Sequence, residues 1–465
     1  MKELTFYTVT YNVCTKSPNQ SIKNLLQWES KNEEAIPDFC IFGFQEVKSQ
    51  PQNLVLDSLF DDPWTTAIRD ILCTFDFVKI RTVKMVGLLL NVFCRRKHVP
   101  YLSHMETSET RTGLFGLWGN KGAVSFSFKV YNTTLCFINC HLAPHEEYLN
   151  DRINNYHNIV ESQCFGLSKK SILSHDYVFW FGDLNFRLEK ANEFSSELIS
   201  HKINLIELSY QSANTLPELW TVEELHNIKK NGRAFKDFFE PMPMFPPTYR
   251  FLVGSSCYDL KRRPAWTDRI LYKSNLLLKK ESRLYVKSYK HIDSIKLSDH
   301  KPVYGEACIY QMSCENCIEK NKRVTFYKIQ QWLLETENEV TLRVKGYVPC
   351  VNDWIGIYNE FYTSLDDYLS YVYLPSESYN FGSEEQSNHT NFDTSTLCRV
   401  RFLPDEYADG SKSICLKFSE TSVLNPGKYI LLYFSRNNNS VLGTSETFEA
   451  KYKPNPCSTL REFGW

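Results

Sequence analysis

Polar residues able to do chemistry follow several apolar stretches in the first two thirds of the chain. The clearest case is WFGDLNFR at 180–187, where Asp183 and Asn185 come directly after the apolar run 177–181. In an extended chain, residues two apart lie on one face, so both side chains could reach one point in space. A carboxylate and an amide at one point suit a metal-bound water or a phosphate.

The same pattern recurs after other apolar stretches, at Asn12, Glu46, His141, Asp268, and the pair Asp299 and His300. Each residue has a structural alternative when taken singly: Asn12 as a turn former, Glu46 as a solvated loop residue, His141 as a core histidine. Their repeated position after apolar strands instead favours convergence at one edge of a sheet.

Length and composition limit the kind of protein. A chain of 465 residues exceeds one typical core and predicts two domains. Its 53 lysines and arginines nearly balance 54 aspartates and glutamates, which argues against attachment to nucleic acid by bulk charge. The apolar run at 86–94 is too short to span a bilayer, and the N-terminus lacks a signal-peptide pattern. These features predict a soluble, cytoplasmic protein that recognises phosphate locally.

Scattered cysteines fit that compartment. Fifteen cysteines follow no disulfide framework, and several lie within apolar strands, as reduced buried thiols do. The CENC motif at 314–317 has metal-ligand spacing but no second pair, which favours a linker over a zinc site.

Apolar stretches of strand length alternate with helical patterns up to about residue 309, notably at 148–165 and 197–230. This predicts an α/β domain with a substantial sheet core over 1–312. After a linker at 313–323, strands and turns dominate and predict a small β-sandwich over 324–453, followed by a tail at 454–465. The polar stretch 376–413 is predicted to be a long mobile insertion in that sandwich.

Motifs of the first domain, in this order, resemble the inositol polyphosphate 5-phosphatases of the exonuclease/endonuclease/phosphatase superfamily. They are WFGDLNFR, PAWTDRIL at 264–271, GLFGLWGNKGAV at 113–124, NCHL at 139–142, FPPTYRF at 245–251 and SDHKPV at 298–303. The tail, with NDWIGIY and YILLYF, resembles a SKICH domain. The resemblance implies a deoxyribonuclease-like αββα fold, two sheets flanked by helices, followed by an immunoglobulin-like β-sandwich.

The resemblance also implies roles at the site. Glu46, Asn12 and Asp299 would hold Mg²⁺ or its water, Asp183 would take a proton from the attacking water, and Asn185 would hold that water. His300 would donate to the scissile phosphate, Asp268 would orient its ring, and His141 would hydrogen-bond the same phosphate. The implied reaction is direct in-line attack with no phosphoenzyme.

Basic and aromatic residues would bind the remaining phosphates. Tyr249, Arg250 and Arg262 match the segment that grips the 4-phosphate in the family, and Arg187 ends the first motif. That segment is shorter in this chain, and Leu260 stands where a lysine is expected, so Lys261 is the substitute. Asn120 and Lys121, between glycines, would meet the 1-phosphate or lipid side. An ordinary solvated basic loop remains the alternative.

Three functions follow. The first is a magnesium-dependent 5-phosphatase acting on phosphatidylinositol 4,5-bisphosphate, with the 3,4,5-trisphosphate and soluble inositol phosphates as further substrates. The others are a nuclease of the same superfamily and a non-catalytic SKICH adaptor. Expected partners are phosphoinositide head groups and proteins bound through the SKICH domain. The protein is expected to be a monomer that associates peripherally with the plasma membrane or the endoplasmic reticulum. No nucleic acid is expected.

One motif points elsewhere. CYDLKRR at 257–263 has the cysteine-to-arginine spacing of cysteine-dependent phosphatases. It lacks glycine and is crowded with long side chains, whereas those enzymes need free amides around a low-pKa thiolate. The spacing is therefore interpreted as coincidence.

Overall fold

The fold is described from a computed structural model. It describes residues 2–28, 32–48, 62–113, 121–166, 168–189, 193–208, 215–275, 284–311, 323–350, 352–374, 399–406, 410–437 and 439–453. The chain divides into two compact units, one of Met1–Arg96 and Glu106–Ser313, the other of Lys97–Met105 and Cys314–Trp465. The predicted linker at 313–323, apart from Arg323, and the predicted tail at 454–465 lie outside the described residues.

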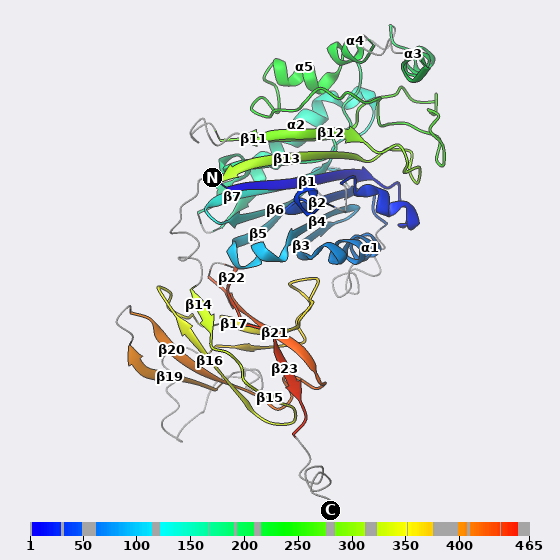
Figure 1. Ribbon diagram of the computed structural model, residues 1–465. Helices are drawn as coiled ribbons and strands as arrows, with labels where there is room; N and C mark the ends of the chain where they lie inside the picture. The colour runs from blue at the N-terminus through cyan, green and yellow to red at the C-terminus, as the bar shows by residue number, and fades with distance from the viewer. Residues whose placement is uncertain are drawn as a thin grey trace, which may run out of the picture. The chain divides into compact units, whose positions relative to one another are not determined.

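Two mixed sheets form the first unit (Figure 1). The first sheet has the order β12-β13-β1-β2-β4-β3, with β1 (Lys2–Asn12), β2 (Phe39–Gln45), β3 (Phe77–Met85), β4 (Leu88–Arg95), β12 (Tyr285–His291) and β13 (Val303–Gln311). The second has the order β11-β10-β7-β6-β5, with β5 (Leu102–Arg111), β6 (Gly122–Val130), β7 (Thr133–His141), β10 (Tyr177–Asp183) and β11 (Asp268–Ser274).

The sheets pack face to face through aromatic side chains. Phe6 of the first sheet lies 5.2 Å from Phe179 of the second, measured between ring centroids, and Phe39 lies 5.7 Å from Phe128. Aromatic pairs at these distances supply much of the apolar area that such a core buries.

Helices cover the outer faces of both sheets (Figure 1). The helices that pack on the sheets are α1 (Pro63–Leu72), α2 (Leu149–Ser162) and α5 (Glu224–Lys230), while α3 (Ser196–Leu208) contacts α4 (Thr215–Thr221), which in turn contacts α5. Trp64 and Ile68 of α1 pack under the first sheet, and Tyr156 of α2 meets Trp180 under the second. The predicted αββα arrangement is confirmed, and helical segments fall where the patterns at 148–165 and 197–230 predict them.

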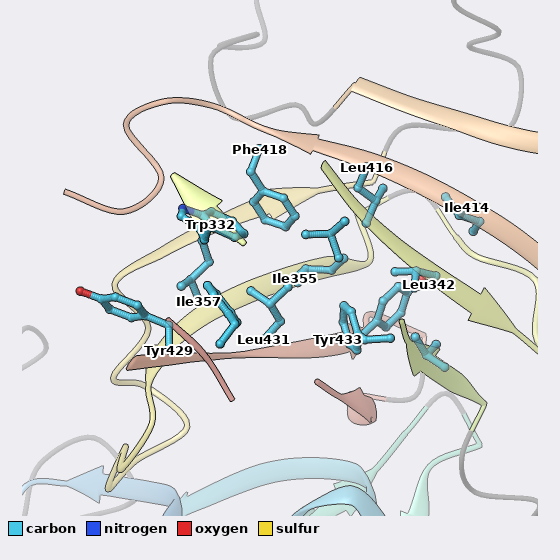
Figure 2. Close-up of a cluster of buried hydrophobic side chains, with 14 of the residues drawn as sticks. Trp332, Leu342, Ile355, Ile357, Ile414, Leu416, Phe418, Tyr429, Leu431 and Tyr433 are labelled. Atoms are coloured by element: carbon cyan, nitrogen blue, oxygen red, sulfur yellow. The ribbon is translucent and has the colours of Figure 1, made fainter. Parts of the chain in front are cut away.

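The second unit is all-β. One sheet has the order β14-β16-β20-β19, with β14 (Val324–Phe326), β16 (Asn338–Val344), β19 (Arg399–Glu406) and β20 (Lys412–Phe418). The other has the order β15-β23-β21-β17-β18, and β22 also pairs with β21; its strands are β15 (Trp332–Leu333), β17 (Trp354–Asn359), β18 (Ser370–Tyr373), β21 (Gly427–Ser435), β22 (Ser440–Thr444) and β23 (Phe448–Lys451). Figure 2 shows the core between them, with Trp332, Leu342, Ile355 and Leu416 facing one another.

The predicted insertion at 376–413 is wrong in part. Residues 399–406 form β19, which pairs antiparallel with β20, and β20 itself begins at Lys412. The alternation of Val400 and Phe402 with arginines in RVRF is a period of two, which is typical of a strand and which the polar residues around it obscured. Residues 375–398 lie outside the described residues.

Candidate active site

Strand register brings the second sheet's site residues together. Asp183, the last residue of β10, pairs with Asp268 of antiparallel β11 on one side and with His141 of parallel β7 on the other. His141 in turn pairs with Gly122, next to Lys121. Because these strands end or begin at one edge, four distant segments of the chain deliver polar side chains to one row.

The first sheet contributes from the same edge. Asn12 pairs with Gln45, so Glu46 lies beside the end of β1. Thr10 pairs with Val303, the first residue of β13. Asp299 and His300, which come just before β13, therefore lie near the end of β1 that carries Asn12.

Strand alternation turns these residues inward. In β1, Tyr7, Val9 and Tyr11 pack in the outer core beside α1, so Asn12 points to the opposite face, toward the second sheet. In β10, Trp180 packs under α2, so Asp183 points toward the first sheet.

Gly182 allows the strands to approach closely before Asp183. Its φ is 142°, and a Cβ added there would lie 2.0 Å from the carbonyl oxygen of Cys140 on β7. Any side chain at this position would therefore push β10 from β7 and separate Asp183 from His141.

Asp183 is the centre of the site. Its Oδ2 accepts a hydrogen bond of 3.0 Å from Asn12 Nδ2 and lies 3.2 Å from His141 Nε2 and 3.9 Å from His300 Nε2. Burial opposes ionisation, but the nearby His141, His300 and Lys121 outweigh it and hold the pKa of Asp183 well below its usual range. The carboxylate is therefore ionised at any physiological pH.

His300 forms a buried pair with Asp268. Nδ1 of His300 lies 2.9 Å from Asp268 Oδ2, which also accepts from the hydroxyl of Thr248 at 2.7 Å. Burial alone would lower the pKa of His300, but the charges of Asp268, Asp183 and Asp299 raise the pKa to about 9. The ring is thus an imidazolium at neutral pH, with Nε2 facing Asp183.

His141 is held differently. Burial and the neighbouring Lys121 lower the pKa of His141 below its ordinary value, whereas the nearby Asp183 and Glu46 oppose this shift. His141 Nε2 lies 3.2 Å from Asp183 Oδ2, and Lys121 Nζ lies 2.5 Å from the same nitrogen and 3.2 Å from Nδ1.

Asn185 reaches the site for another reason than predicted. The strand ends at Asp183, and Asn185 has a φ of 57°, so the two side chains do not share a face of an extended chain. Instead the backbone amide of Asn185 donates to Asp183 Oδ1 at 3.1 Å, and the side-chain Nδ2 of Asn185 donates to the carbonyl of Leu142 at 3.2 Å. Arg187 donates back to the carbonyl of Asn185 at 3.0 Å, and its guanidinium lies 4.8 Å from the Tyr249 ring.

One pocket collects most of the predicted residues. Those that line it are Glu46, Lys121, His141, Asp183, Asn185, Arg187, Tyr249, Arg250, Arg262, Asp299 and His300. Asn12 and Asp268 lie behind it, hydrogen-bonded to Asp183 and His300. Lys261 is exposed and is not among the described residues of the lining, and Asn120 lies outside the described residues.

The segment predicted to grip a 4-phosphate is partly engaged with carboxylates. Arg250 Nε lies 3.2 Å from Asp299 Oδ2 and 3.5 Å from Asp259 Oδ2. Tyr249 packs its ring 4.5 Å from the ring of His300. Arg262 reaches the pocket, so two guanidinium groups stand on this wall.

The sequence interpretation missed one wall of the pocket. Pro144, His145 and Glu146 line it from the loop after β7. Buried Arg152 of α2 fixes this loop by donating to the carbonyls of Ala143 at 3.3 Å and of His145 at 2.5 Å. The polar run HLAPHEE beyond the strand was the available signal.

A carboxylate on α5 ties this wall to the next one. Glu224 Oε2 accepts from Arg152 at 2.8 Å and from the backbone amide of Arg187 at 2.8 Å. The Arg152–Glu224 pair therefore holds both the 143–146 loop and Arg187 in position.

The cysteine motif does not form a phosphate cradle. Cys257 is exposed, and Arg263 pairs with Glu146 through two contacts of 3.1 and 2.9 Å. Arg263 also donates to the Leu188 carbonyl at 2.7 Å, so its guanidinium is engaged in the pocket wall.

Oxygen and nitrogen ligands for a divalent cation are present. Asp183, Asp268 and His300 offer ligand atoms within 4.8 Å of one another. Glu46 offers a second carboxylate that faces the pocket with its side chain 32% exposed, and its Oε1 lies 4.0 Å from His141 Nε2. Such hard ligands fit a cation of the Mg²⁺ or Ca²⁺ type.

Comparison with known proteins agrees with this geometry. Residues 9–306 match the model of the Endonuclease/Exonuclease/phosphatase family 2, and residues 324–408 match the SKICH domain. The mouse Inositol polyphosphate 5-phosphatase K is 32% identical over 99% of this chain and 91% of its own length. The mouse Phosphatidylinositol 4,5-bisphosphate 5-phosphatase A is 32% identical over 95% of this chain, which spans 41% of that relative.

Solved structures give the same result. The inositol polyphosphate 5-phosphatase domain of SPsynaptojanin, in complex with inositol (1,4)-bisphosphate and calcium ion, has a TM-score of 0.55 and 29% identity, covering 69% of this chain and 89% of that one. Cimex nitrophorin, at 22% identity and a TM-score of 0.52, shares the fold alone. The chain belongs to the inositol polyphosphate 5-phosphatase family and carries a C-terminal SKICH domain.

Proposed function

We propose that this chain is a Mg²⁺-dependent phosphatase that removes the 5-phosphate of phosphatidylinositol 4,5-bisphosphate. The 3,4,5-trisphosphate and soluble inositol polyphosphates are further substrates. Support comes from two relatives, one named as a 5-phosphatase of inositol polyphosphate and the other as a 5-phosphatase of phosphatidylinositol 4,5-bisphosphate. It also comes from the inositol (1,4)-bisphosphate held by a similar structure, since this compound is what remains when inositol 1,4,5-trisphosphate loses its 5-phosphate.

The surroundings of Asp183 carry the proposal. One ionised carboxylate oxygen has Asn12, His141 and His300 within 3.9 Å, at the bottom of a pocket with several cationic side chains. An ionised base beside an imidazolium acid suits hydrolysis of a phosphate monoester.

Asp183 orients the attacking water and accepts its proton. Its low pKa in the free site reflects the cations around it. A phosphate dianion bound among His141, Lys121 and His300 would offset those charges, so the proton affinity of Asp183 rises when substrate arrives. The backbone amide of Asn185 donates to Asp183 Oδ1, and Asn185 holds the same water.

His300 supplies the acid. Its imidazolium, oriented by Asp268, donates a proton to a phosphate oxygen while negative charge develops there. The water oxygen bonds to phosphorus as the bond to the 5-oxygen of inositol breaks on the opposite side, and the released 5-oxygen takes a proton from solvent water to become the hydroxyl. His141 and Lys121 bind the same phosphate, and Arg187, Tyr249, Arg250 and Arg262 bind the remaining phosphates.

Glu46 is the proposed main Mg²⁺ ligand, assisted by Asp299 and Asn12. Its carboxylate faces the pocket, whereas Asp268 and His300 already satisfy each other at 2.9 Å. Bound Mg²⁺ would neutralise charge on the phosphate and the leaving oxygen.

Phosphate release from short-chain phosphatidylinositol 4,5-bisphosphate tests the proposal, with Mg²⁺ or chelator present. Asp183→Asn, which keeps the side-chain volume, should lower kcat by about 10² to 10⁴. Cys257→Ser should match the wild type, since Cys257 is exposed outside the pocket. Product analysis should find the 4-phosphate retained. A folded wild type that releases no phosphate, or a Cys257→Ser variant that loses activity, would contradict the assignment, and plasmid nicking would then test the nuclease alternative.

A further inference from the structure

Exposed apolar side chains gather on one short hairpin beside the pocket. Phe251 and Tyr258 pair across this hairpin and stack their rings at 4.4 Å. Beyond them, Leu252 is 49% and Val253 is 53% exposed, and Leu260 on the returning strand is 45% exposed. Single exposed leucines are common, but Leu252 and Val253 are adjacent at the turn of the hairpin and form a local apolar tip. We call residues 252–260 the apolar hairpin.

The backbone of the apolar hairpin is fixed by hydrogen bonds. Leu252 donates to the carbonyl of Cys257 at 2.9 Å, and Gly254 donates to the carbonyl of Lys296 at 2.8 Å. The Tyr258 hydroxyl donates to the Pro247 carbonyl at 2.7 Å. The base of the hairpin is therefore anchored in the domain, while the side chains of Leu252 and Val253 face solvent.

Two lysines lie near the apolar hairpin: Lys261 follows it in the sequence, and the carbonyl of Lys296 accepts from Gly254. Lys261 and Lys296 are exposed. The nearby acidic groups already have cationic partners, because Asp259 pairs with Arg250 at 3.5 Å and Asp293 pairs with Lys301 at 3.1 Å. An apolar tip with free positive charge beside it complements the headgroup region of an anionic bilayer.

The apolar hairpin is continuous with the substrate pocket. Arg250 lines the pocket two residues before Leu252, and Arg262 lines it two residues after Leu260. Two residues span at most about 7 Å of chain, so the tip and the pocket wall are immediate neighbours.

We propose that Leu252 and Val253 insert into the interfacial layer of an anionic bilayer, with Lys261 and Lys296 against lipid phosphates. This contact would hold the pocket over the lipid head group that it cleaves. The inference rests on the proposed function, and it assigns a membrane-facing role to a part of the catalytic domain that has no role in the chemistry.

The test compares one full-length protein on two substrates of equal head group. The variant Leu252→Glu/Val253→Glu is assayed on soluble dibutanoyl phosphatidylinositol 4,5-bisphosphate and on vesicles of phosphatidylcholine, phosphatidylserine and long-chain phosphatidylinositol 4,5-bisphosphate. Tyr285→Glu is the matched control, since Tyr285 is 57% exposed and pairs with Cys308, toward the far end of the first sheet from the site.

The double variant should keep its kcat/KM on the soluble substrate within about twofold and lose at least tenfold on vesicles, with a parallel loss in vesicle sedimentation. Tyr285→Glu should change neither. Equal losses on both substrates would indicate damage to the pocket and overturn the inference. Unchanged activity of the double variant on vesicles would also overturn the inference, and the apolar tip would then be tested as a binding site for a protein partner. A wild type inactive on both substrates would instead refute the proposed function.

Discussion

Asn12 Nδ2 donates a hydrogen bond of 3.0 Å to Asp183 Oδ2, which joins the last residue of β1 in one sheet to the last residue of β10 in the other. Asn12 Oδ1 is fixed by the backbone amide of Cys14 at 3.0 Å, so the direction of the Asn12 amide is set by the chain. The proposed base is therefore oriented by the opposite sheet, and its position depends on how the two sheets pack.

Removing this donor should impair catalysis more than folding. Asn12→Ala deletes a hydrogen bond to a charged group, worth about 1.5–3 kcal/mol, and should lower kcat by about 10- to 100-fold. The assay is phosphate release from the soluble substrate, with thermal unfolding as the check on folding. Thr10→Val, on the same face of β1, is the control and should stay within about threefold. Equal effects of the two changes would mean that Asn12 acts only as part of the core.

The Asp268–His300 pair predicts a pH dependence. Since the pKa of His300 is raised to about 9, the imidazolium is present below that pH and kcat/KM should fall as pH rises through about 9. Asp268→Asn removes the negative charge that contributes most to raising the pKa of His300, which leaves the opposite effect of burial less balanced. The alkaline limb of the pH profile should therefore move to lower pH by at least about one unit. Profiles between pH 6 and 10 would measure this.

Thr248→Val is the control for that profile. It removes the hydroxyl that donates to Asp268 Oδ2 at 2.7 Å but keeps the carboxylate charge. Its alkaline limb should stay near that of the wild type. A limb that does not move in Asp268→Asn would show that His300 is not the acid.

Glu46 should set the requirement for metal. Glu46→Gln keeps the shape of the side chain but removes its charge, and it should raise the Mg²⁺ concentration for half-maximal activity by at least about tenfold. Glu146→Gln changes another pocket-lining carboxylate, which pairs with Arg263, and should leave that concentration nearly unchanged. The reverse order of effects would favour a cation held by Asp183, Asp268 and His300.

Arg152 should matter for both stability and substrate binding. Arg152→Met leaves Glu224 buried without its cation, which should lower the free energy of unfolding by about 3–5 kcal/mol. Because Arg152 also holds the 143–146 loop, KM should rise. Arg233→Met, which loses only an exposed contact to Asn150, should change unfolding by less than about 0.5 kcal/mol.

A double variant separates these two consequences. Arg152→Met/Glu224→Leu removes both charges and should recover much of the stability in denaturant unfolding while KM stays high. Recovery of KM together with stability would contradict the positioning role.

The convergence of Glu46, His141, Asp183 and His300 could be predicted because each follows or precedes an apolar strand, and strand ends meet at sheet edges. Which strands pair, and in which register, could not be predicted from local patterns, because strand order and register arise from long-range packing. The pairing of Asp183 with both His141 and Asp268 is of this kind.

Loops were the main source of error. The 143–146 wall has no periodic pattern, and its path is set by Arg152 and Glu224, which are remote in sequence. Asn185 reaches the site through a left-handed backbone conformation that the extended-chain argument did not anticipate. The strand β19 was hidden by the polar residues around it.

The inward direction of Asn12 and Asp183 limits where this chain tolerates insertions. One residue added within β1 or β10 would reverse the alternation beyond it and turn the Asn12 or Asp183 side chain toward the helix layer. Two added residues would restore the face but move the side chain along the strand by about 7 Å. Length variation compatible with activity is therefore confined to the connections between strands, where the apolar hairpin and the 143–146 loop lie.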